Sequence, residues 1–258
     1  CYIAAKLSGI PVLIHEANAI PGWANKLGIN FAKLTFTAFA STSKFGGKWG
    51  SAMLAGMPIR EEIFAISNLS KSERSAKWDA TYRQLELDRS NRTIFIFGGS
   101  LGAQSINTAV ALALPELLNR GFNIIHAVGQ NNELPRSRPG YAPLSYITNM
   151  ADMYIASDLV ISRGGAVTCA ELDMANSFAL IVPLPIGNGE QLANAQDLVD
   201  KGAAKICLNS EFTADWLLAN IDSLASAADS WNIKRVQNSK QRAAEIIGKS
   251  ILEKLKVN

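Results

Sequence analysis

Residues 93–97 (TIFIF) are β-branched or aromatic, and they lead directly into the glycine-rich segment 98–103 (GGSLGA), after which an apolar helical pattern begins. This order predicts a buried strand, a tight turn and the start of a helix. A helix start offers unpaired N–H groups and the positive end of the helix dipole, and glycine lets the backbone approach an anion closely. The turn therefore fits a phosphate or diphosphate, although many α/β proteins have glycine-rich turns for packing reasons alone.

Strand-like and helix-like segments alternate along the whole chain. The predicted strands lie at residues 11–15, 34–38, 52–55, 93–97, 123–128, 158–162, 179–183 and 204–208. The predicted helices lie at residues 22–31, 73–87, 103–119, 149–155, 165–176, 190–201, 213–227 and 233–256. This alternation predicts an α/β fold with parallel sheets and helices on both of their faces. With 258 residues, 48% of them hydrophobic, the chain is long enough for two domains.

The predicted strands fall into two groups. Residues 1–60 contain three of them, too few for a sheet that stands alone, whereas residues 61–232 hold a polar connector and then a complete α/β unit. Residues 233–258 form a basic, amphipathic last helix, which fits a membrane surface or, more commonly, packing on a sheet. Because residues 2–7 already read as the body of a helix, we expect that the chain lacks an N-terminal part.

Composition excludes several classes of protein. Three cysteines without C-x-x-C spacing indicate neither a disulfide framework nor a zinc site, and they favour the cytoplasm. No apolar run reaches the roughly 18 residues that a membrane-spanning helix needs. A net charge of +3 is too small to indicate a nucleic-acid partner. These counts leave a globular α/β protein.

Two further polar turns follow predicted strands. Residues 163–171 (RGGAVTCAE) place a glycine pair before a helix, and residues 183–194 (PLPIGNGEQLAN) bring polar side chains to the start of the next helix. In an open parallel sheet, ligands bind beyond the carboxyl ends of the strands. We therefore expect these turns and the turn at residues 98–103 to converge on one crevice.

Two charged residues suit a ligand in such a crevice. Glu171 can accept hydrogen bonds from two adjacent sugar hydroxyls, although its spacing alone slightly favours an ordinary surface or ion-paired glutamate. Arg60 follows a Gly-x-Pro turn at the end of the first segment. It can reach a diphosphate from a hinge between domains or simply point into solvent.

The first segment carries polar residues of its own. His15, Glu16 and Asn18 follow the first predicted strand and are expected to face the same cleft, although such a histidine is more often structural and Glu16 also suits a helix cap. Cys169 lies at a helix start, which can lower a thiol pKa, but packing is the better explanation because no histidine is near in sequence. His126 lies inside a predicted strand and is expected in the core.

Together these motifs resemble the MurG family of peptidoglycan N-acetylglucosaminyltransferases. The likeness rests on residues 15–18 (HEAN), 98–103 (GGSLGA), 163–171 (RGGAVTCAE) and 189–195 (GEQLANA), and it runs over nearly the whole chain. It implies the GT-B architecture, in which two Rossmann-like domains face each other across a cleft. The first domain would be incomplete here, and residues 233–258 would cross back to it.

The resemblance also implies a reaction. N-acetylglucosamine would pass from UDP-N-acetylglucosamine to the C4 hydroxyl of the muramyl sugar of undecaprenyl-linked lipid I, giving lipid II for peptidoglycan synthesis and hence for cell shape and division. The displacement would invert the anomeric carbon, and the protein would lie peripherally at the cytoplasmic face of the bacterial cell membrane. No cofactor and no metal are implied, so the glycine turns are expected to stabilise the leaving diphosphate.

Donor-binding residues follow from the same resemblance. Ser100 would hold the diphosphate, and Ile147 would contact uracil through its backbone. Glu171 would bind the ribose hydroxyls, and Gln191 the hydroxyls of the sugar. The first domain would contribute two residues, Asn18 and Arg60. One helix start would line the nucleotide with Ala166, Val167, Thr168, Cys169 and Ala170.

The chain departs from the family pattern in a few places. Met57, Gly164 and Ala170 stand where Asn, Ser and Ser are common, which changes detail rather than function. The attacking hydroxyl needs a base. The resemblance places that base before residue 1, and within the chain only His15 and Glu16 are weak candidates.

Other functions remain open. A nucleotide-sugar-binding subunit would take the acceptor domain from a partner, but it would not retain residues 1–60. Another GT-B enzyme, such as a UDP-sugar epimerase, would need other carboxylates and histidines in the cleft, and the chain has only two histidines. A purely structural role is the weakest alternative, because packing alone does not explain three polar turns at strand ends.

Overall fold

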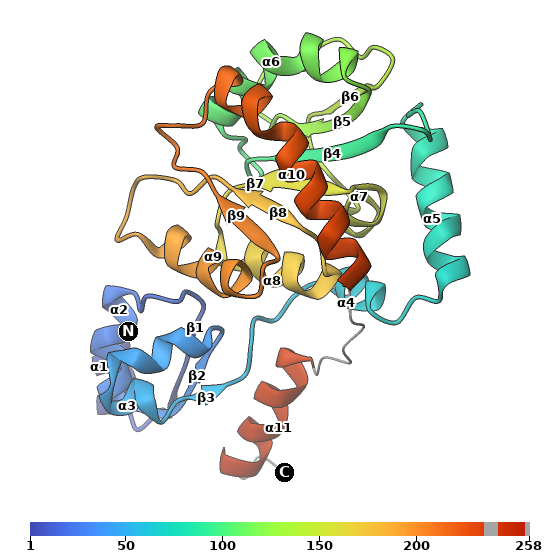
Figure 1. The fold of residues 1–258 in the computed structure, drawn as a ribbon. Helices are drawn as coiled ribbons and strands as arrows, with labels where there is room; N and C mark the ends of the chain where they lie inside the picture. The colour runs from blue at the N-terminus through green and yellow to red at the C-terminus, as the bar shows by residue number, and fades with distance from the viewer. Residues whose placement is uncertain (235–241, 256–258) are drawn as a thin grey trace.

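The computed structural model describes residues 1–234 and 242–255, which fold around two parallel sheets (Figure 1). The smaller sheet has the strand order β1-β2-β3, and the larger one has the order β6-β5-β4-β7-β8-β9. Figure 1 shows the smaller sheet with its helices at the lower left and the larger sheet above it. The predicted α/β fold with parallel sheets is confirmed.

The first lobe contains residues 1–54. Its elements are α1 (Tyr2–Leu7), β1 (Val12–Glu16), α2 (Trp23–Gly28), η1 (Ile29–Phe31), β2 (Ala32–Thr37), η2 (Ala40–Phe45), α3 (Gly47–Gly50) and β3 (Met53–Leu54). Its core is small, because only Val12, Ile14, Ile29 and Trp49 form a buried apolar cluster there. The expected three-strand sheet is therefore present, with little apolar surface to stabilise it.

The second lobe contains the larger sheet and its helices. Its elements are α4 (Glu61–Ile66), α5 (Lys71–Gln84), β4 (Arg92–Phe97), α6 (Gln104–Asn119), β5 (Phe122–Ala127), β6 (Tyr141–Leu144), α7 (Met150–Ala156), β7 (Leu159–Ser162), α8 (Ala166–Ala175), β8 (Ala179–Ile181), α9 (Glu190–Asp200), β9 (Ala204–Ile206) and α10 (Ala214–Lys234). A last helix, α11 (Ala243–Leu255), lies below the larger sheet in Figure 1, and its Ser250 hydroxyl donates to Met53 Sδ in β3 at 3.3 Å.

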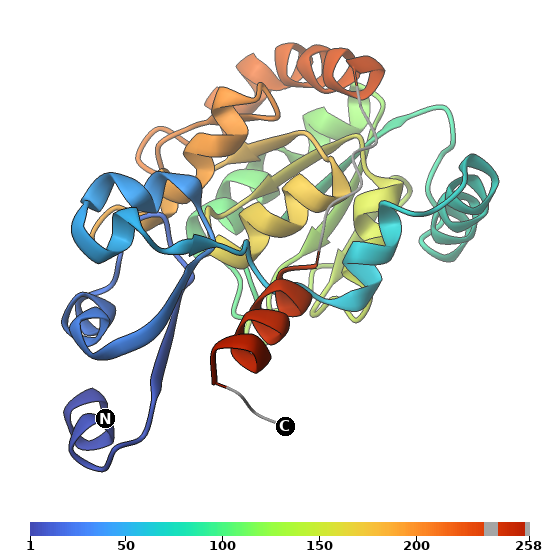
Figure 2. The same ribbon diagram turned by 90° about the horizontal axis from the view of Figure 1, so that it is seen from below.

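Both faces of the larger sheet are buried. Along β4, Ile94 and Ile96 pack against α6 and α10, whereas Phe95 and Phe97 pack against the layer that contains α7, α8 and α9. Alternate residues of a strand point to opposite faces, so an unbroken apolar run is what a doubly covered strand requires. In the view from below, α4, α7 and α8 lie in front of the sheet (Figure 2).

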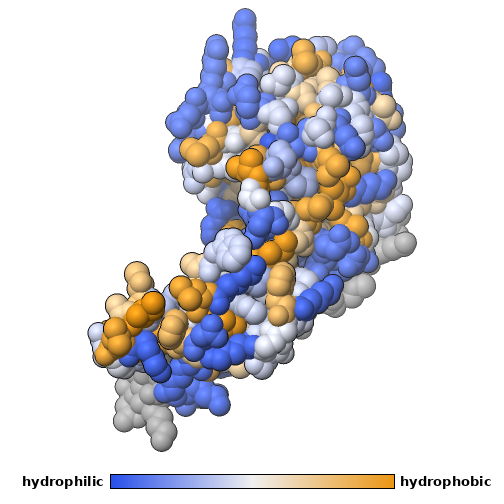
Figure 3. Space-filling model, turned by 90° about the vertical axis from the view of Figure 1, so that its left-hand side faces the viewer, coloured by the Kyte–Doolittle hydropathy of each residue, from blue (hydrophilic) through white to orange (hydrophobic). Residues whose placement is uncertain are grey.

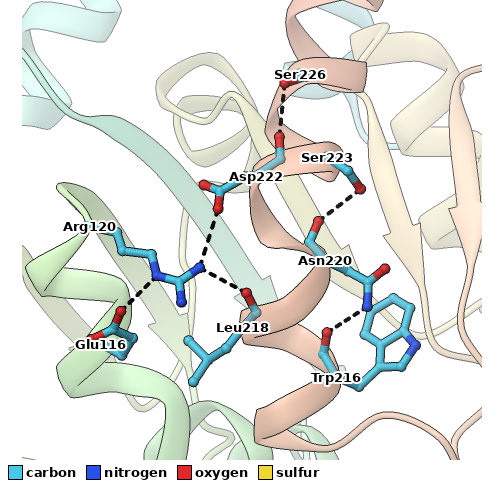
Figure 4. Close-up of polar contacts among 8 residues, drawn as sticks. All are labelled: Glu116, Arg120, Trp216, Leu218, Asn220, Asp222, Ser223 and Ser226. Atoms are coloured by element: carbon cyan, nitrogen blue, oxygen red, sulfur yellow. Dashed lines mark hydrogen bonds and ion pairs between the residues drawn. The ribbon is translucent and has the colours of Figure 1, made fainter.

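A polar contact joins the two helices that cover the other face. Arg120, at the end of α6, donates to Glu116 in the preceding turn at 2.8 Å. The same guanidinium donates to the carbonyl oxygen of Leu218 at 2.9 Å and to Asp222 at 3.3 Å, both on α10 (Figure 4). The contact is exposed, so it orients the helix ends and contributes little to stability.

The strand order has one consequence for ligands. The chain runs from β4 outward to β6 and then returns to β7 on the other side of β4. The turns after β4 and β7 therefore leave the sheet in opposite directions, which opens a gap at the strand carboxyl ends.

The elements that were not predicted from the sequence include β6 and α4. The edge strand β6 contains Pro143, which pairs with His126 in β5. An edge strand tolerates proline because one side of its backbone needs no partner, but proline hides such a strand from pattern analysis. The short helix α4 lies in the predicted polar connector, where Ile63 and Ile66 are buried against the second lobe.

Some predicted helix ends were also wrong. The helix predicted at residues 22–31 stops at Gly28 and continues as the 3-10 turn η1, while α10 continues to Lys234 instead of ending at residue 227. Of the helix predicted at residues 233–256, residues 243–255 are helical as α11, and residues 235–241 lie outside the described residues. The boundaries at residues 60 and 232 stay predictions. Among the described helices, none is long and apolar enough to cross a membrane.

One buried histidine gives the fold a pH dependence. His126 is 2% exposed, contacts the hydroxyl of Tyr141 at 3.2 Å and Asn107 at 3.1 Å, and its pKa is lowered by burial to about 4. In the unfolded chain the imidazole of His126 takes up a proton near pH 6.5, whereas in the folded chain it stays neutral at that pH. The free energy of unfolding is therefore expected to fall by about 3 kcal/mol as the pH drops from 6.5 to 4.

Urea unfolding at several pH values checks this expectation. His126→Gln keeps a polar side chain but cannot titrate, so its stability should depend less steeply on pH in this window. Tyr141→Phe removes the hydroxyl partner and keeps the imidazole, so its slope should match the unsubstituted chain. Equal slopes for His126→Gln and the unsubstituted chain would contradict the expectation.

Candidate functional site

Two adjoining hollows lie beyond the carboxyl ends of β4, β7 and β8. Their volumes are about 200 and 510 Å³, and both are lined by Phe97, Gly99 and Thr168. We call the two hollows together the crevice. The larger one falls within the roughly 300–1,000 Å³ typical of small-molecule sites. The three predicted turns are thus brought to one place, because residues of all three line the crevice.

The turn after β4 is tightly folded. Gly102 has a φ of +79°, and a Cβ there would lie 2.0 Å from the carbonyl oxygen of Val128. A Cβ on Gly98 would lie 2.4 Å from the backbone nitrogen of Ala103. Helix α6 then begins at Gln104, with no side chain capping its first N–H groups. An uncapped helix start behind a glycine turn is suited to bind an anion.

Some of the expected site residues line the crevice and others do not. The smaller hollow is lined by Arg60, Ser100, Ile147, Val167, Thr168 and Glu171. The larger hollow is lined by Thr168 and Gln191. The residues that line neither hollow are His15, Glu16, Asn18, Ala166, Cys169 and Ala170.

Helix geometry explains part of this separation. Glu171 follows Val167 by four residues and Thr168 by three, so all three lie on the side of α8 that faces the crevice. Cys169 and Ala170 face the other way and line a separate cavity of about 640 Å³ between the lobes. Six consecutive helical residues cannot all present their side chains to one face, and Ala166, Cys169 and Ala170 line neither hollow of the crevice.

The cavity between the lobes differs from the crevice in character. Phe39, Phe64 and Met174 contribute to its walls, and so do Met57 and Ala170, two of the departures from the family pattern. Cys169 is 1% exposed beside it, and burial raises the pKa of its thiol to about 12. A protonated, buried thiol is a packing residue, as the sequence analysis favoured.

A buried carboxylate lies at the floor of the smaller hollow. Glu171 is 2% exposed, and its Oε1 accepts from Nε and Nη2 of Arg60 at 3.1 and 2.9 Å. Its Oε2 accepts from the hydroxyl of Tyr154 at 3.2 Å. The ion pair that the sequence left open as an alternative is present, and the carboxylate also borders the crevice. Arg60 is not free in solvent, since it reaches this carboxylate from the segment between the lobes.

Arg163 belongs to the site but was not predicted as a site residue from the sequence. Its Nη1 donates to the carbonyl oxygen of Val182 at 2.9 Å and to Asn209 at 2.7 Å, and its Nη2 donates to Ser105 at 2.9 Å. These bonds hold a guanidinium in the wall of the larger hollow. Its place directly after a predicted strand was the available signal, but nothing local in the sequence shows where the side chain points.

The third turn holds Gln191 against the sheet. Gln191 Oε1 accepts from the backbone N–H of Leu184 at 3.0 Å, which fixes the amide at the entrance of α9. A Cβ on Gly164 would lie 2.2 Å from the carbonyl oxygen of Gln191. The turn after β7 and the start of α9 therefore touch backbone to backbone, and glycine at position 164 permits that contact.

The expected polar residues of the first lobe form structural contacts. Asn194 on α9 is completely buried, accepts from the backbone N–H of Ala19 at 2.8 Å and donates to Asn18 at 3.1 Å. Glu16 is 2% exposed and accepts from the backbone N–H groups of Asn18 and Gly22 and from Asn25 at 2.9–3.0 Å. His15 Nε2 lies 2.8 Å from the carbonyl oxygen of Gly56. These bonds stabilise the loop after β1 and its junction with the second lobe.

Within residues 1–234 and 242–255, no three His, Cys, Asp or Glu side chains gather in a way that could hold a metal ion. The charged groups that the crevice does present are Arg60, Arg163 and Glu171.

Known proteins resemble this chain in sequence and fold. Two similar curated proteins are UDP-N-acetylglucosamine–N-acetylmuramyl-(pentapeptide) pyrophosphoryl-undecaprenol N-acetylglucosamine transferases. The protein from Corynebacterium glutamicum strain R is 41% identical over 225 residues, which cover 86% of this chain and 60% of that protein. The protein from Streptomyces coelicolor is 38% identical over 225 residues, which cover 85% of this chain and 59% of that protein. The chain thus spans about 60% of the length of these relatives.

Solved structures agree with this likeness. A crystal structure of Acinetobacter baumannii MurG superimposes on this chain with a TM-score of 0.74 and 31% sequence identity. The match covers 98% of this chain and 69% of the MurG chain. A Staphylococcus aureus MnaA–UDP complex shares the fold, with a TM-score of 0.64 at 13% identity. The model of the glycosyltransferase family 28 C-terminal domain matches residues 93–249, which contain most of the crevice. The chain has the GT-B architecture that the sequence predicted, and it belongs to glycosyltransferase family 28.

Proposed function

We propose that this chain binds UDP-N-acetylglucosamine in the crevice and transfers the sugar to the C4 hydroxyl of the muramyl sugar in undecaprenyl-linked lipid I. The observation that carries the proposal is a pair of features inside the segment that matches the family: the buried carboxylate of Glu171 lines the smaller hollow, and the uncapped start of α6 lines the adjoining larger hollow. Relatives named for this reaction support it. So does a fold shared with a UDP complex.

The donor would lie across both hollows. Ser100 and the backbone N–H groups of residues 98–103 would hold the diphosphate, while Ile147 would contact uracil from the smaller hollow. Glu171 would accept hydrogen bonds from the ribose hydroxyls after Arg60 moves from its Oε1. Gln191 would bind the sugar hydroxyls in the larger hollow. In this arrangement Asn18 supports the site through Asn194 instead of touching the donor.

The chemistry is a single displacement. The C4 hydroxyl of the acceptor attacks the anomeric carbon as the bond to UDP breaks, which inverts the configuration there. Negative charge then grows on the diphosphate, where the start of α6 and the fixed guanidinium of Arg163 stabilise it. In this mechanism, the residues of this chain therefore stabilise the UDP leaving group.

The acceptor hydroxyl must lose its proton as it attacks. The two weak candidates are occupied elsewhere, since Glu16 accepts three hydrogen bonds in its loop and His15 contacts a backbone carbonyl. We assign the role of base to neither of them.

The acceptor is a lipid, and the first lobe supports its use at a membrane surface. Large apolar side chains are exposed there, among them Leu7, Trp23 and Phe45, and Lys26 lies over the rings of Trp23 and Phe45 at 4.9 and 5.6 Å. Figure 3 shows apolar and hydrophilic residues side by side on the lower lobe and a hollow between this lobe and the upper one. Exposed aromatic side chains mixed with lysine suit an interface with anionic lipid.

Calorimetric titration with UDP-N-acetylglucosamine tests the donor site. We expect binding that is tighter than for UDP-glucose or ADP-glucose. Gln191→Ala should weaken binding of UDP-N-acetylglucosamine about tenfold and leave UDP nearly unchanged, because only the sugar loses a hydrogen bond. Gln196→Ala is the matched control, since Gln196 lies on the same helix but bonds to Asp200 at the surface.

Two outcomes would contradict the proposal in different ways. Equal affinity for all three nucleotide sugars would overturn the donor site. Selective binding without transfer of labelled sugar to lipid I in vesicles would leave a donor-binding protein and overturn the catalytic part. Sedimentation with those vesicles, compared with the Trp23→Ala variant, checks the membrane surface in the same preparation.

A further inference from the structure

A buried tyrosine lies directly behind the crevice. Tyr154 on α7 is 1% exposed, and its ring is enclosed by Phe95 and Phe97 at centroid distances of 5.9 and 6.3 Å. Both ring contacts are edge-on, so the aromatic core fixes the position of the side chain. Its hydroxyl therefore has a fixed direction, toward Glu171.

The hydroxyl of Tyr154 is the donor in its contact with Glu171. Burial raises the pKa of Tyr154 well above 10, so the group keeps its proton at neutral pH. The carboxylate of Glu171 can only accept, and the bond between Tyr154 and its Oε2 is 3.2 Å long. This bond holds one end of the carboxylate against the core.

The two oxygens of Glu171 have partners of different kinds. Oε2 is bound by Tyr154, which is enclosed and cannot leave. Oε1 is bound by Arg60, whose side chain is 45% exposed and belongs to the segment between the lobes. One partner is therefore fixed, and the other can be exchanged for a ligand.

We infer that Tyr154 is a positioning residue for the donor nucleoside: it holds Oε2 of Glu171 so that Oε1 faces the crevice, where the ribose hydroxyls replace Arg60. The inference rests on the proposed function and adds a residue that does not touch the ligand. Without the tyrosine hydroxyl, the carboxylate can turn about its last side-chain bond, and selectivity for a 2′-hydroxyl is lost with only a small loss of overall affinity.

Comparison of UDP with 2′-deoxy-UDP, by calorimetry on the full chain, isolates this effect. The unsubstituted chain should bind UDP at least tenfold more tightly, since the deoxy compound lacks one hydrogen bond to a charged acceptor. Tyr154→Phe should reduce this preference to about threefold or less. Thermal denaturation of each variant verifies that it is folded.

Tyr141→Phe is the matched control. Tyr141 is also buried, and its hydroxyl forms a bond of the same 3.2 Å length, but to His126 in the edge region of the sheet. Its removal should leave the preference for UDP unchanged. A general loosening of the sheet would reduce the preference in both variants and overturn the inference.

A double variant tests whether Tyr154 acts through Glu171. Glu171→Gln should abolish the preference for UDP, and adding Tyr154→Phe should then change nothing further. If Glu171→Gln abolishes the preference but Tyr154→Phe retains it, the donor site stands and the positioning role is wrong. If Glu171→Gln leaves the preference intact, the proposed ribose site itself is wrong, and the inference falls with it.

Discussion

Replacing Glu171 by alanine is expected to lower the affinity for UDP about 100-fold. The carboxylate is buried at the floor of the smaller hollow, and in the proposed function it accepts hydrogen bonds from two ribose hydroxyls. A hydrogen bond to a charged group contributes about 1.5 kcal/mol, and about 1.4 kcal/mol corresponds to a factor of ten in affinity. Two such bonds therefore account for a loss of this size.

The variant is expected to remain folded. Arg60 is half-exposed and can turn into solvent when its partner is removed. The buried hydroxyl of Tyr154 loses its acceptor, which costs about 1–3 kcal/mol. Titration calorimetry measures the affinity, and thermal denaturation measures the accompanying loss of stability.

A control on the same helix separates the ligand effect from the loss of an ion pair. Asp173 lies two residues further along α8, pairs with Lys201 at 2.8 Å and lines the cavity between the lobes instead of the crevice. Asp173→Ala should therefore leave the affinity for UDP within about twofold. An affinity for Glu171→Ala within threefold of the unsubstituted chain would sink the proposed ribose contact.

Gly102→Ala is expected to cause the largest loss of stability. A Cβ at this position would lie 2.0 Å from the carbonyl oxygen of Val128. The two turns are equally close at Gly129, where an added Cβ would lie 2.3 Å from the backbone nitrogen of Gly102. The left-handed φ of +79° costs an alanine about 1–2 kcal/mol, and the steric overlap costs about 1–3 kcal/mol more. The free energy of unfolding should fall by about 3 kcal/mol.

Gly202→Ala is the reference variant, because it introduces backbone strain from a positive φ without a steric overlap of the new Cβ. Its φ is +76°, but no atom lies within 4 Å of the added Cβ. Urea unfolding should therefore show a loss of only about 1 kcal/mol for this variant. If both variants lose the same free energy, the close contact between the turns after β4 and β5 does not stabilise the fold.

The pattern of neighbouring residues in the sequence was sufficient to predict the main strands and helices. The run of apolar residues at 93–97 predicted a strand buried on both faces, and β4 is such a strand. The glycines that follow predicted a tight turn before a helix, and Gly102 has the positive φ that only a glycine adopts easily. These features depend on a few consecutive residues, so they can be read without knowledge of distant contacts.

Where local signals were weak, prediction failed. The edge strand β6 contains a proline and pairs on one side only, and α4 is short and gains its stability from two isoleucines that dock on the second lobe. Neither has a periodic pattern long enough to recognise. Packing against distant residues determined both.

The sequence by itself determined the α/β class, the strand ends at which polar turns gather and the likeness to a family of glycosyltransferases. The tertiary structure alone decided the partners of those residues. It joined Arg60 and Tyr154 to Glu171, bound Asn18 to Asn194, and turned Cys169 and Ala170 away from the crevice. The reason is physical: turns and strands follow from neighbouring residues, whereas hydrogen bonds between residues far apart in sequence exist only once the layers have packed.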